Sequence, residues 1–104
     1  MSEPKGYWIV HMDVTDPEAY KAYVAANGPA IAAFDGKFLT RGGTSEVKEG
    51  ALRARHVVLE FPSYKAATDC YASEAYQAAL KLRSNASAGD LVIVEGYNGP
   101  HPGE

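Results

Sequence analysis

A short strand followed directly by a long helical segment is the feature that most restricts how this chain can fold. In residues 55–80, an apolar run ends at Phe61-Pro62, and Ser63 is placed to cap the helix that follows. The sequence EAYQA at residues 74–78 repeats the pattern EAYKA of residues 18–22, and each copy comes after an apolar, strand-like run. The chain is therefore expected to consist of two β-α halves.

The first half opens with a strand expected over residues 5–14. Its side chains alternate between two faces, which is the period of a strand. One face carries Trp8, Val10, Met12 and Val14, and the other carries Tyr7, Ile9, His11 and Asp13. The first set is expected to belong to the core. The second set is apolar at one end and polar at the other, which suggests a half-buried surface.

Two overlapping signals mark the start of the helix that follows this strand. Either residues 15–18 form a capping box, or Asp16 is the cap and Pro17 takes the first helical position. Apolar residues then recur at intervals of three and four, which predicts one buried stripe. Pro29 interrupts the pattern, so the helix is expected to bend or restart near Asn27.

The remaining elements alternate between strands and helix. A strand is expected over residues 37–41, a ragged edge at 44–48 and a further strand over 55–61. Either one helix with a break near Ala72 or two short helices come next. A polar helix end at 85–89 then leads to a last strand over residues 90–97. The order β-α-β-β-α-β is the ferredoxin-like plan, an α+β fold with a four-stranded antiparallel sheet and both helices on one face. We expect one domain over residues 1–97 and a flexible tail over 98–104.

The sheet face that no helix covers is the basis for predicting a homodimer. It carries Tyr7, Ile9, Val58 and one side of the last strand, which is more apolar than a solvated face should be. Two such faces packed together would bury this surface.

Several segments of the chain together resemble domain-of-unknown-function family 1330. They are GYWI at residues 6–9, DPEAY at 16–20, FLTRGG at 38–43, VVLEFPS at 57–63, SEAY at 73–76 and LVIVEG at 91–96. The resemblance covers about residues 6–97. It implies membership of the dimeric α/β-barrel superfamily, with a ferredoxin-like protomer and a barrel-like dimer. It implies no reaction, because relatives in the superfamily include cofactor-free monooxygenases, haem-degrading enzymes, lactone isomerases and ligand-binding modules.

Charge and composition argue against two classes of partner. The net charge is -3 and the basic residues are scattered, so no nucleic-acid partner is expected. No apolar run approaches the roughly 20 residues that cross a bilayer, and no signal-peptide core is present, so we expect no membrane contact and a cytoplasmic protein. The single cysteine, Cys70, fits a reducing compartment.

His11 is the candidate general base on the first strand. A histidine on a half-apolar strand can transfer protons or ligate haem, or it can simply form a hydrogen bond at an interface. Asp13, on the same face, is placed to orient it. The three histidines show no metal-ligand spacing, so no metal site is predicted, and no cofactor is expected, with haem left as an alternative.

Three further polar residues complete the candidate site. Arg41 stands before two glycines and is either an anion holder or a solvated turn residue. Glu60, between apolar neighbours, is expected either to have a raised pKa or to pair with a cation such as Arg41 or Arg83, and it is a second catalytic candidate. Asn27 either points its amide into a cleft between helix and sheet or only ends the first part of the helix.

Three functions remain open at this stage. The first is binding or transforming a small organic molecule in an apolar cleft near the sheet, closed by dimerisation, with His11, Arg41 and Glu60 as its polar anchors. The second is a non-catalytic dimeric binding or interaction module. The third is a haem-binding or cofactor-free monooxygenase-like enzyme.

Overall fold

The structure, a computed structural model, describes residues 3–103. Along this part of the chain the elements are β1 (Gly6–Val14), α1 (Pro17–Ala32), β2 (Lys37–Arg41), β3 (Arg55–Phe61), α2 (Tyr64–Ala72), α3 (Glu74–Arg83) and β4 (Ser87–Glu95). Residues 1–2 of the predicted domain and residue 104 of the predicted tail lie outside the described residues.

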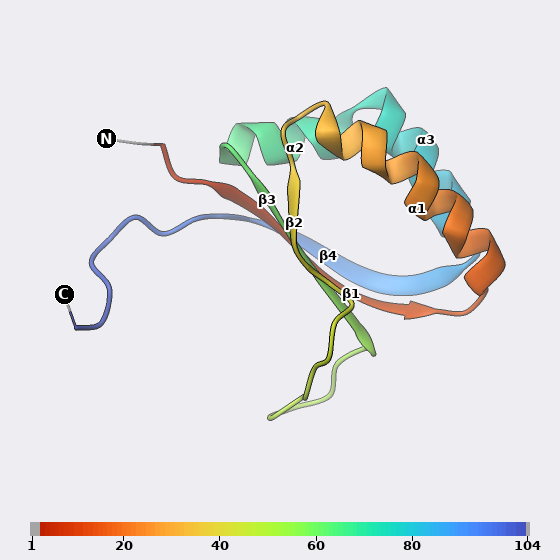
Figure 1. Cartoon of the computed structure of the whole chain (residues 1–104), viewed down its shortest axis with the longest axis horizontal. Helices are drawn as coiled ribbons and strands as arrows, with labels where there is room; N and C mark the ends of the chain where they lie inside the picture. The colour runs from red at the N-terminus through yellow and green to blue at the C-terminus, as the bar shows by residue number, and fades with distance from the viewer. Residues whose placement is uncertain (1–2, 104) are drawn as a thin grey trace.

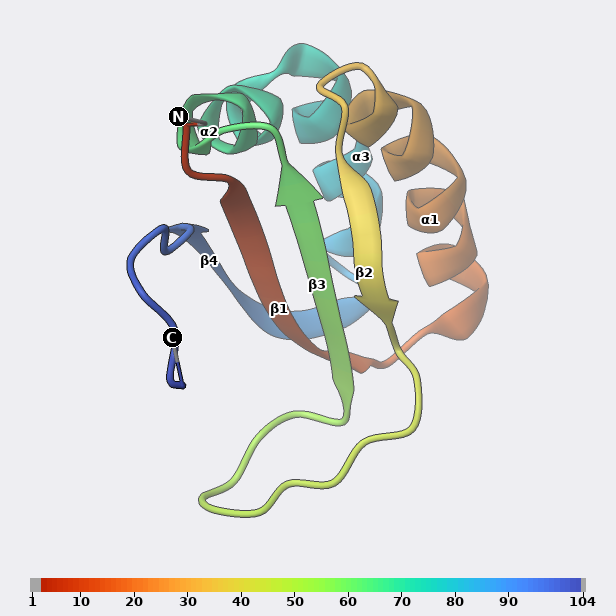
Figure 2. The same cartoon turned by 60° about the vertical axis from the view of Figure 1, so that its left-hand side comes forward.

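The four strands form one antiparallel sheet in the order β2-β3-β1-β4 (Figure 2). All the described helices lie in a layer over the same side of this sheet (Figure 1). We call that side the helix-covered face and the other side the open face. This order and layering are those of a ferredoxin-like fold, so the predicted α+β class is confirmed.

The helix starts follow from side-chain caps. Asp16 is the N-cap of α1, because its carboxylate accepts a hydrogen bond from the Ala19 amide at 3.2 Å, and Pro17 takes the first helical position. Ser63 caps α2. Ser73 both ends α2 and caps α3, so the second helical stretch is two short helices.

The predicted restart of the first helix is wrong. α1 continues as one helix through Pro29 to its end at Ala32. Pro29 stands in the last turn, where its missing N–H leaves only one carbonyl without its usual helical partner. Ala30 and Ile31 beyond it are 2% and 3% exposed, so burial in the core holds this turn in place.

The core lies between the helix layer and the sheet, with the indole of Trp8 near its centre. Trp8 is 1% exposed, packs against the Phe61 ring with centroids 5.1 Å apart, and donates a hydrogen bond from Nε1 to the Ala67 carbonyl at 3.0 Å. Its other neighbours include the fully buried Tyr76. Cys70 is also fully buried, and burial raises the pKa of its thiol to about 11, as expected for a small core residue.

The last strand and the expected ragged edge differ from the prediction. β4 begins at Ser87 rather than at residue 90, because the small residues 87–89 continue the ladder to the end of β1. Gly89 suits this position, since a Cβ there would overlap the side chain of Met12. Residues 44–48, the expected ragged edge, are exposed and form no strand.

No described helix lies over the open face (Figure 1), and this face carries apolar side chains. On β4, Val92 and Val94 are 52% and 40% exposed, and they lie opposite Ile9 and Tyr7 of β1. After β4, residues 96–103 contain no helix or strand. In this segment the Tyr97 hydroxyl donates a hydrogen bond to the Pro100 carbonyl at 2.9 Å.

Candidate functional site

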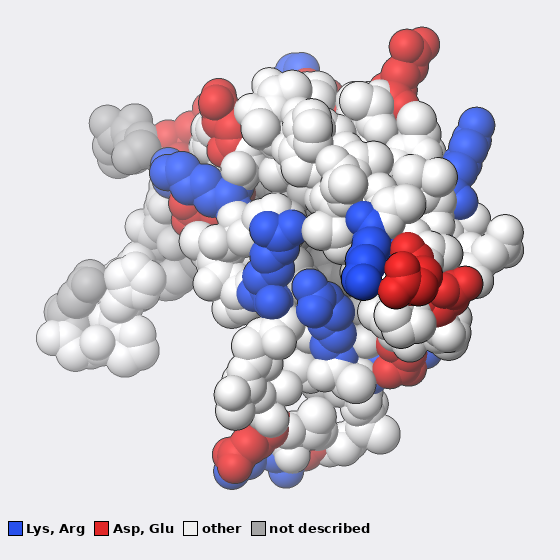
Figure 3. Space-filling view, turned by 45° about the vertical axis from the view of Figure 1, so that its right-hand side comes forward, with Lys and Arg blue, Asp and Glu red and all other residues white. Residues whose placement is uncertain are grey.

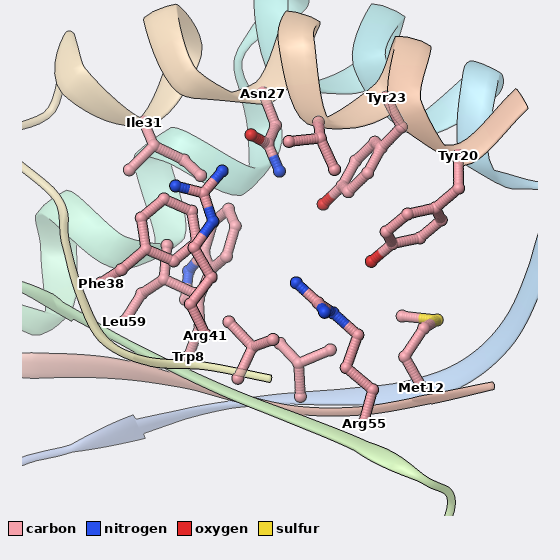
Figure 4. A pocket seen from close by; sticks show the side chains of 13 residues that line it. Trp8, Met12, Tyr20, Tyr23, Asn27, Ile31, Phe38, Arg41, Arg55 and Leu59 are labelled. Carbon is pink, nitrogen blue, oxygen red and sulfur yellow. The ribbon is translucent and has the colours of Figure 1, made fainter. Parts of the chain in front are cut away.

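A cavity lies between α1 and the helix-covered face, and we call it the α1 cavity. It has a volume of about 30 Å³ and is partly open to solvent. The walls come from α1, β1, β2 and β3. Figure 4 shows that the polar ends of Tyr20, Tyr23, Asn27, Arg41 and Arg55 are directed into this space.

A β-bulge in β2 places Arg41 at the cavity. Phe38 pairs with Leu59 and Thr40 pairs with Val58, so one extra residue, Leu39, is inserted opposite β3. The insertion shifts the alternation by one, and Phe38 and Arg41 therefore face the same side of the sheet. The Arg41 guanidinium lies 4.1 Å from the centre of the Phe38 ring.

Arg55 approaches the cavity from the first position of β3. Alternation along this strand places it on the helix-covered face together with Val57 and Leu59. Arg55 is half-buried, and its Nε is buried without a hydrogen-bond partner. Its guanidinium lies against Gly42, whose φ of 73° and lack of a Cβ allow the close approach.

Asn27 enters the cavity from the helix side. It belongs to the same stripe of α1 as Tyr20, Tyr23 and Ile31, and it is only 5% exposed. Its Oδ1 is buried and accepts no hydrogen bond. Of the two alternatives for Asn27, the structure therefore shows the amide in a cleft between helix and sheet.

A hydrogen-bonded group of tyrosines lies behind one wall of the cavity. The hydroxyls of Tyr23 and Tyr76 are 2.8 Å apart, and Arg83 donates to the Tyr76 hydroxyl at 3.4 Å. Burial, with a further contribution from Tyr23, raises the pKa of Tyr76, although Arg83 acts in the opposite direction. Burial likewise raises the pKa of Tyr20, so the phenols of Tyr20 and Tyr76 stay neutral at ordinary pH.

His11 and Asp13 lie on the open face, away from the α1 cavity. The Nδ1 atoms of His11 and His56 are 2.9 Å apart, so one ring donates to the other. Asp13 does not orient His11. Its carboxylate accepts from the Ala54 amide and from Arg53, both at 3.0 Å, and these partners, the amide first, lower its pKa.

Glu60 also lies on the open face, and the predicted ion pair with Arg41 or Arg83 is not found. The Tyr7 hydroxyl donates to Glu60 at 3.1 Å, and Lys37 is its cross-strand neighbour. Burial first, and then the nearby carboxylate, raise the pKa of Tyr7. The reason is geometric: Glu60 projects from the open face, whereas Arg41 is on the helix-covered face and Arg83 belongs to α3.

The predicted site residues therefore divide into two groups separated by the sheet. Arg41 and Asn27 meet at the α1 cavity, whereas His11, Asp13 and Glu60 lie on the open face. The cleft was expected to be closed by dimerisation, but this cavity forms within a single chain. Sequence reasoning missed Arg55, Tyr20 and Tyr23 as cavity residues. For Arg55 a signal existed, because strand alternation already placed it on the same face as three buried apolar residues.

The haem alternative was based on a histidine in an apolar pocket, and neither region provides one. The α1 cavity contains no histidine, and His11 stands beside Asp13, Arg53 and Asp90. Within residues 3–103, no three His, Cys, Asp or Glu side chains are grouped so that they could hold a metal ion.

Comparison with known proteins identifies a family and a fold. The family model described as Domain of unknown function (DUF1330) matches residues 5–97. No curated protein gives a significant match. In the described part of the chain, no helix has the length and apolar character needed to cross a membrane.

Solved structures with a similar fold come from several bacteria. A protein of unknown function from Rhodopseudomonas palustris has a TM-score of 0.73 and 19% identity, over 93% of this chain and 85% of that one. SnoaB, a cofactor-independent oxygenase from Streptomyces nogalater, has a TM-score of 0.62 and 12% identity, over 97% and 99%. A possible oxidoreductase from Bacteroides thetaiotaomicron has a TM-score of 0.58 and 11% identity, over 90% and 99%. At such identities the likeness establishes the fold alone, which is ferredoxin-like.

Proposed function

We propose that this chain, which belongs to the domain-of-unknown-function family DUF1330, binds a small organic molecule in the α1 cavity. One observation carries the proposal: Asn27 Oδ1 and Arg55 Nε are buried, lack hydrogen-bond partners and belong to side chains that line the cavity. Buried polar atoms are nearly always paired, and leaving one unpaired costs about 1–3 kcal/mol. The polar groups of a ligand would satisfy both atoms.

The shape and lining of the cavity support a small, flat ligand. Ligand sites are commonly clefts of about 300–1,000 Å³ with mostly apolar walls and a few polar groups that fix orientation. The α1 cavity, at about 30 Å³, is smaller than this range, so the side chains around it would have to move apart to admit a ligand. Trp8, Ile31, Phe38 and Leu59 supply apolar walls (Figure 4).

The chemistry of the cavity favours binding over catalysis. Its polar groups are two guanidinium groups, an amide and two phenols. A guanidinium does not lose its proton in proteins, an amide is not a base, and a phenol ordinarily titrates near about 10. None of them is suited to abstract a proton at neutral pH. His11, the base expected from the sequence, faces the opposite side of the sheet. The cavity therefore has no general base for a reaction of the kind named for SnoaB, cofactor-independent oxygenation.

We further propose that the binding form is a homodimer joined through the open face. Exposed Val92 and Val94, together with Ile9 and Val58 on neighbouring strands, give this face an apolar centre. The similar structures belong to the dimeric α/β-barrel fold family. Sedimentation at micromolar concentration should give a mass near twice 11.1 kDa, and a monomer under these conditions would contradict the dimer.

The binding proposal is tested by screening small metabolites for thermal stabilisation and repeating each positive result on Asn27→Leu. Leucine keeps the site buried but removes the amide, so we expect binding at the cavity to be lost. The matched control is Asn85→Leu, which makes the same exchange at an exposed turn position far from the cavity lining. If ligands bind Asn27→Leu as well as they bind the unchanged protein, the cavity is not their site.

A further inference from the structure

We infer that the ligand of the α1 cavity is a small carboxylate with an apolar body, whose anionic group is held between Arg41 and Arg55. This inference rests on the proposed function, because it names the class of molecule that the same cavity binds. It starts from an imbalance of charge. Two arginines line the cavity, whereas no aspartate or glutamate does.

Neither arginine has an anionic partner in the described part of the chain. Among residues 3–103, the ion pairs of arginine are those of Arg53, with Asp13 at 3.0 Å and Asp90 at 3.1 Å. Arg55 comes two residues later and is half-buried, yet it forms none. A partly buried charge without a partner is unfavourable, and an anion from solution removes that penalty. The net charge of the whole chain is -3, so the positive charge of Arg41 and Arg55 at the cavity is opposite in sign to the charge of the protein.

The register places the two guanidinium groups within reach of one anion. Arg41 pairs with Val57, and Arg55 is the preceding residue on the same face of β3. Such diagonal neighbours are about 7–8 Å apart in a sheet, a separation that long side chains can bridge. Figure 4 shows both groups turned toward the space under α1, and Figure 3 shows basic side chains gathered around a hollow on this side of the molecule.

The surroundings favour a carboxylate over a phosphate. Guanidinium groups bind a carboxylate through paired, charge-assisted hydrogen bonds. A phosphate has additional oxygens and is usually held by backbone amides as well. Here the Gly42 amide donates to the His56 carbonyl at 3.0 Å, so it is already engaged in the sheet.

The rest of the cavity indicates the body of the molecule. Phe38 stacks on Arg41 and, with Trp8 and Leu59, provides flat apolar surfaces next to the proposed anion position. Asn27 lies across the space and has an unpaired oxygen, which calls for a donor such as a hydroxyl. A hydroxylated aromatic or branched aliphatic acid combines these properties.

The test is calorimetric titration with 4-hydroxybenzoate, benzoate, phenylacetate and 4-methylpentanoate, and with 4-hydroxybenzamide and phenyl phosphate as matched probes. We expect at least one acid to bind, and 4-hydroxybenzoate to bind at least about tenfold more tightly than its amide, because the charge-assisted contacts are absent from the amide. Arg55→Met and Arg41→Gln should each weaken the acid by at least about tenfold. Arg53→Met, which removes the same charge from the opposite face, should not.

The outcomes separate this inference from the proposed function. Equal binding of the acid and its amide, both lost in Asn27→Leu, would overturn the carboxylate while leaving the cavity as a binding site. Tighter binding of phenyl phosphate, or no binding of any acid at millimolar concentration, would also overturn it. Since Arg55 carries an unpaired charge, Arg55→Met should fold normally by circular dichroism, and the exposed Arg41→Gln gives an independent reading.

Discussion

Replacing Asn27 with leucine should make the protein more stable and at the same time abolish its binding of ligand. Asn27 is 5% exposed, and its Oδ1 has no hydrogen-bond partner. A residue kept for structure alone would be expected to pair its polar atoms, whereas a residue kept for a ligand can leave them unpaired in the free protein. The two roles therefore predict opposite effects of the substitution on stability.

The expected gain in unfolding free energy is about 1–2 kcal/mol, as the balance of favourable and unfavourable contributions. Removing an unsatisfied buried polar atom recovers about 1–3 kcal/mol. Leucine also favours the helix over asparagine by a few tenths of a kcal/mol, and its apolar side chain would lie near Val24 and Ile31. Against these, the bulkier, non-planar leucine side chain must fit a narrow space, at a cost of about 1 kcal/mol or more.

The assay is urea unfolding together with thermal unfolding at one fixed protein concentration, because dimerisation would make the melting temperature depend on concentration. For a domain of this size, each kcal/mol shifts the melting temperature by about 4–8 °C. Asn85→Leu is the control, and as an exposed substitution it should stay within about 0.5 kcal/mol of the unchanged protein.

A clear loss of stability in Asn27→Leu would refute the reasoning. It would show that the amide is paired in solution, for example through a bound water, and serves the fold itself. Retention of ligand affinity in this variant would refute the functional half separately.

Three further predictions follow from the geometry. Gly42→Ala should lower the unfolding free energy by about 1–2 kcal/mol in urea titrations, because the φ of Gly42 is 73°. Gly43→Ala should have little effect, since Gly43 has open space around it and no positive φ. Equal losses in both variants would contradict the role given to the positive φ of Gly42. The pKa of Asp13 is lowered in the folded protein, so its carboxylate adds stability above its ordinary pKa and loses it as the pH falls through the lowered value. Asp13→Asn should therefore be less stable than the unchanged protein at pH near 7 and should converge with it in strong acid, and a constant difference at every pH would contradict this. Val92→Glu should give monomers in sedimentation, because it places a charge on the open face. Leu82→Glu, at an exposed position of α3, should remain dimeric. Dimers of both variants would show that the interface is not on the open face.

The arrangement of helices and strands could be predicted well because its signals are local. β2 and β3 occupy the predicted residues, and the start of α1 follows one of the two caps expected for it. The proline in α1 was the main error. Its effect on a lone helix is disruptive, but burial of the following turn outweighs the loss of one backbone hydrogen bond.

The candidate site could be predicted only in part because its members come together across the fold. Arg41 and Asn27 were predicted as site residues and lie at the α1 cavity, but they were grouped with His11 and Glu60 from the opposite face. The short segment KFLTR contains no residue that predicts a β-bulge, because the bulge arises from how β2 pairs with β3.

The sequence by itself determined the elements, their order and the side of each regular strand that belongs in the core, since these depend on periodicity and on capping residues along the chain. Only the tertiary structure decided which polar groups meet. A bulge turned Arg41 beneath α1, register placed Arg55 diagonally across from it, and packing left Asn27 opposite both without a partner. The reason is physical: hydrogen bonding and charge neutralisation depend on distances in space, and residues far apart in the chain acquire those distances only when the sheet and helices pack together.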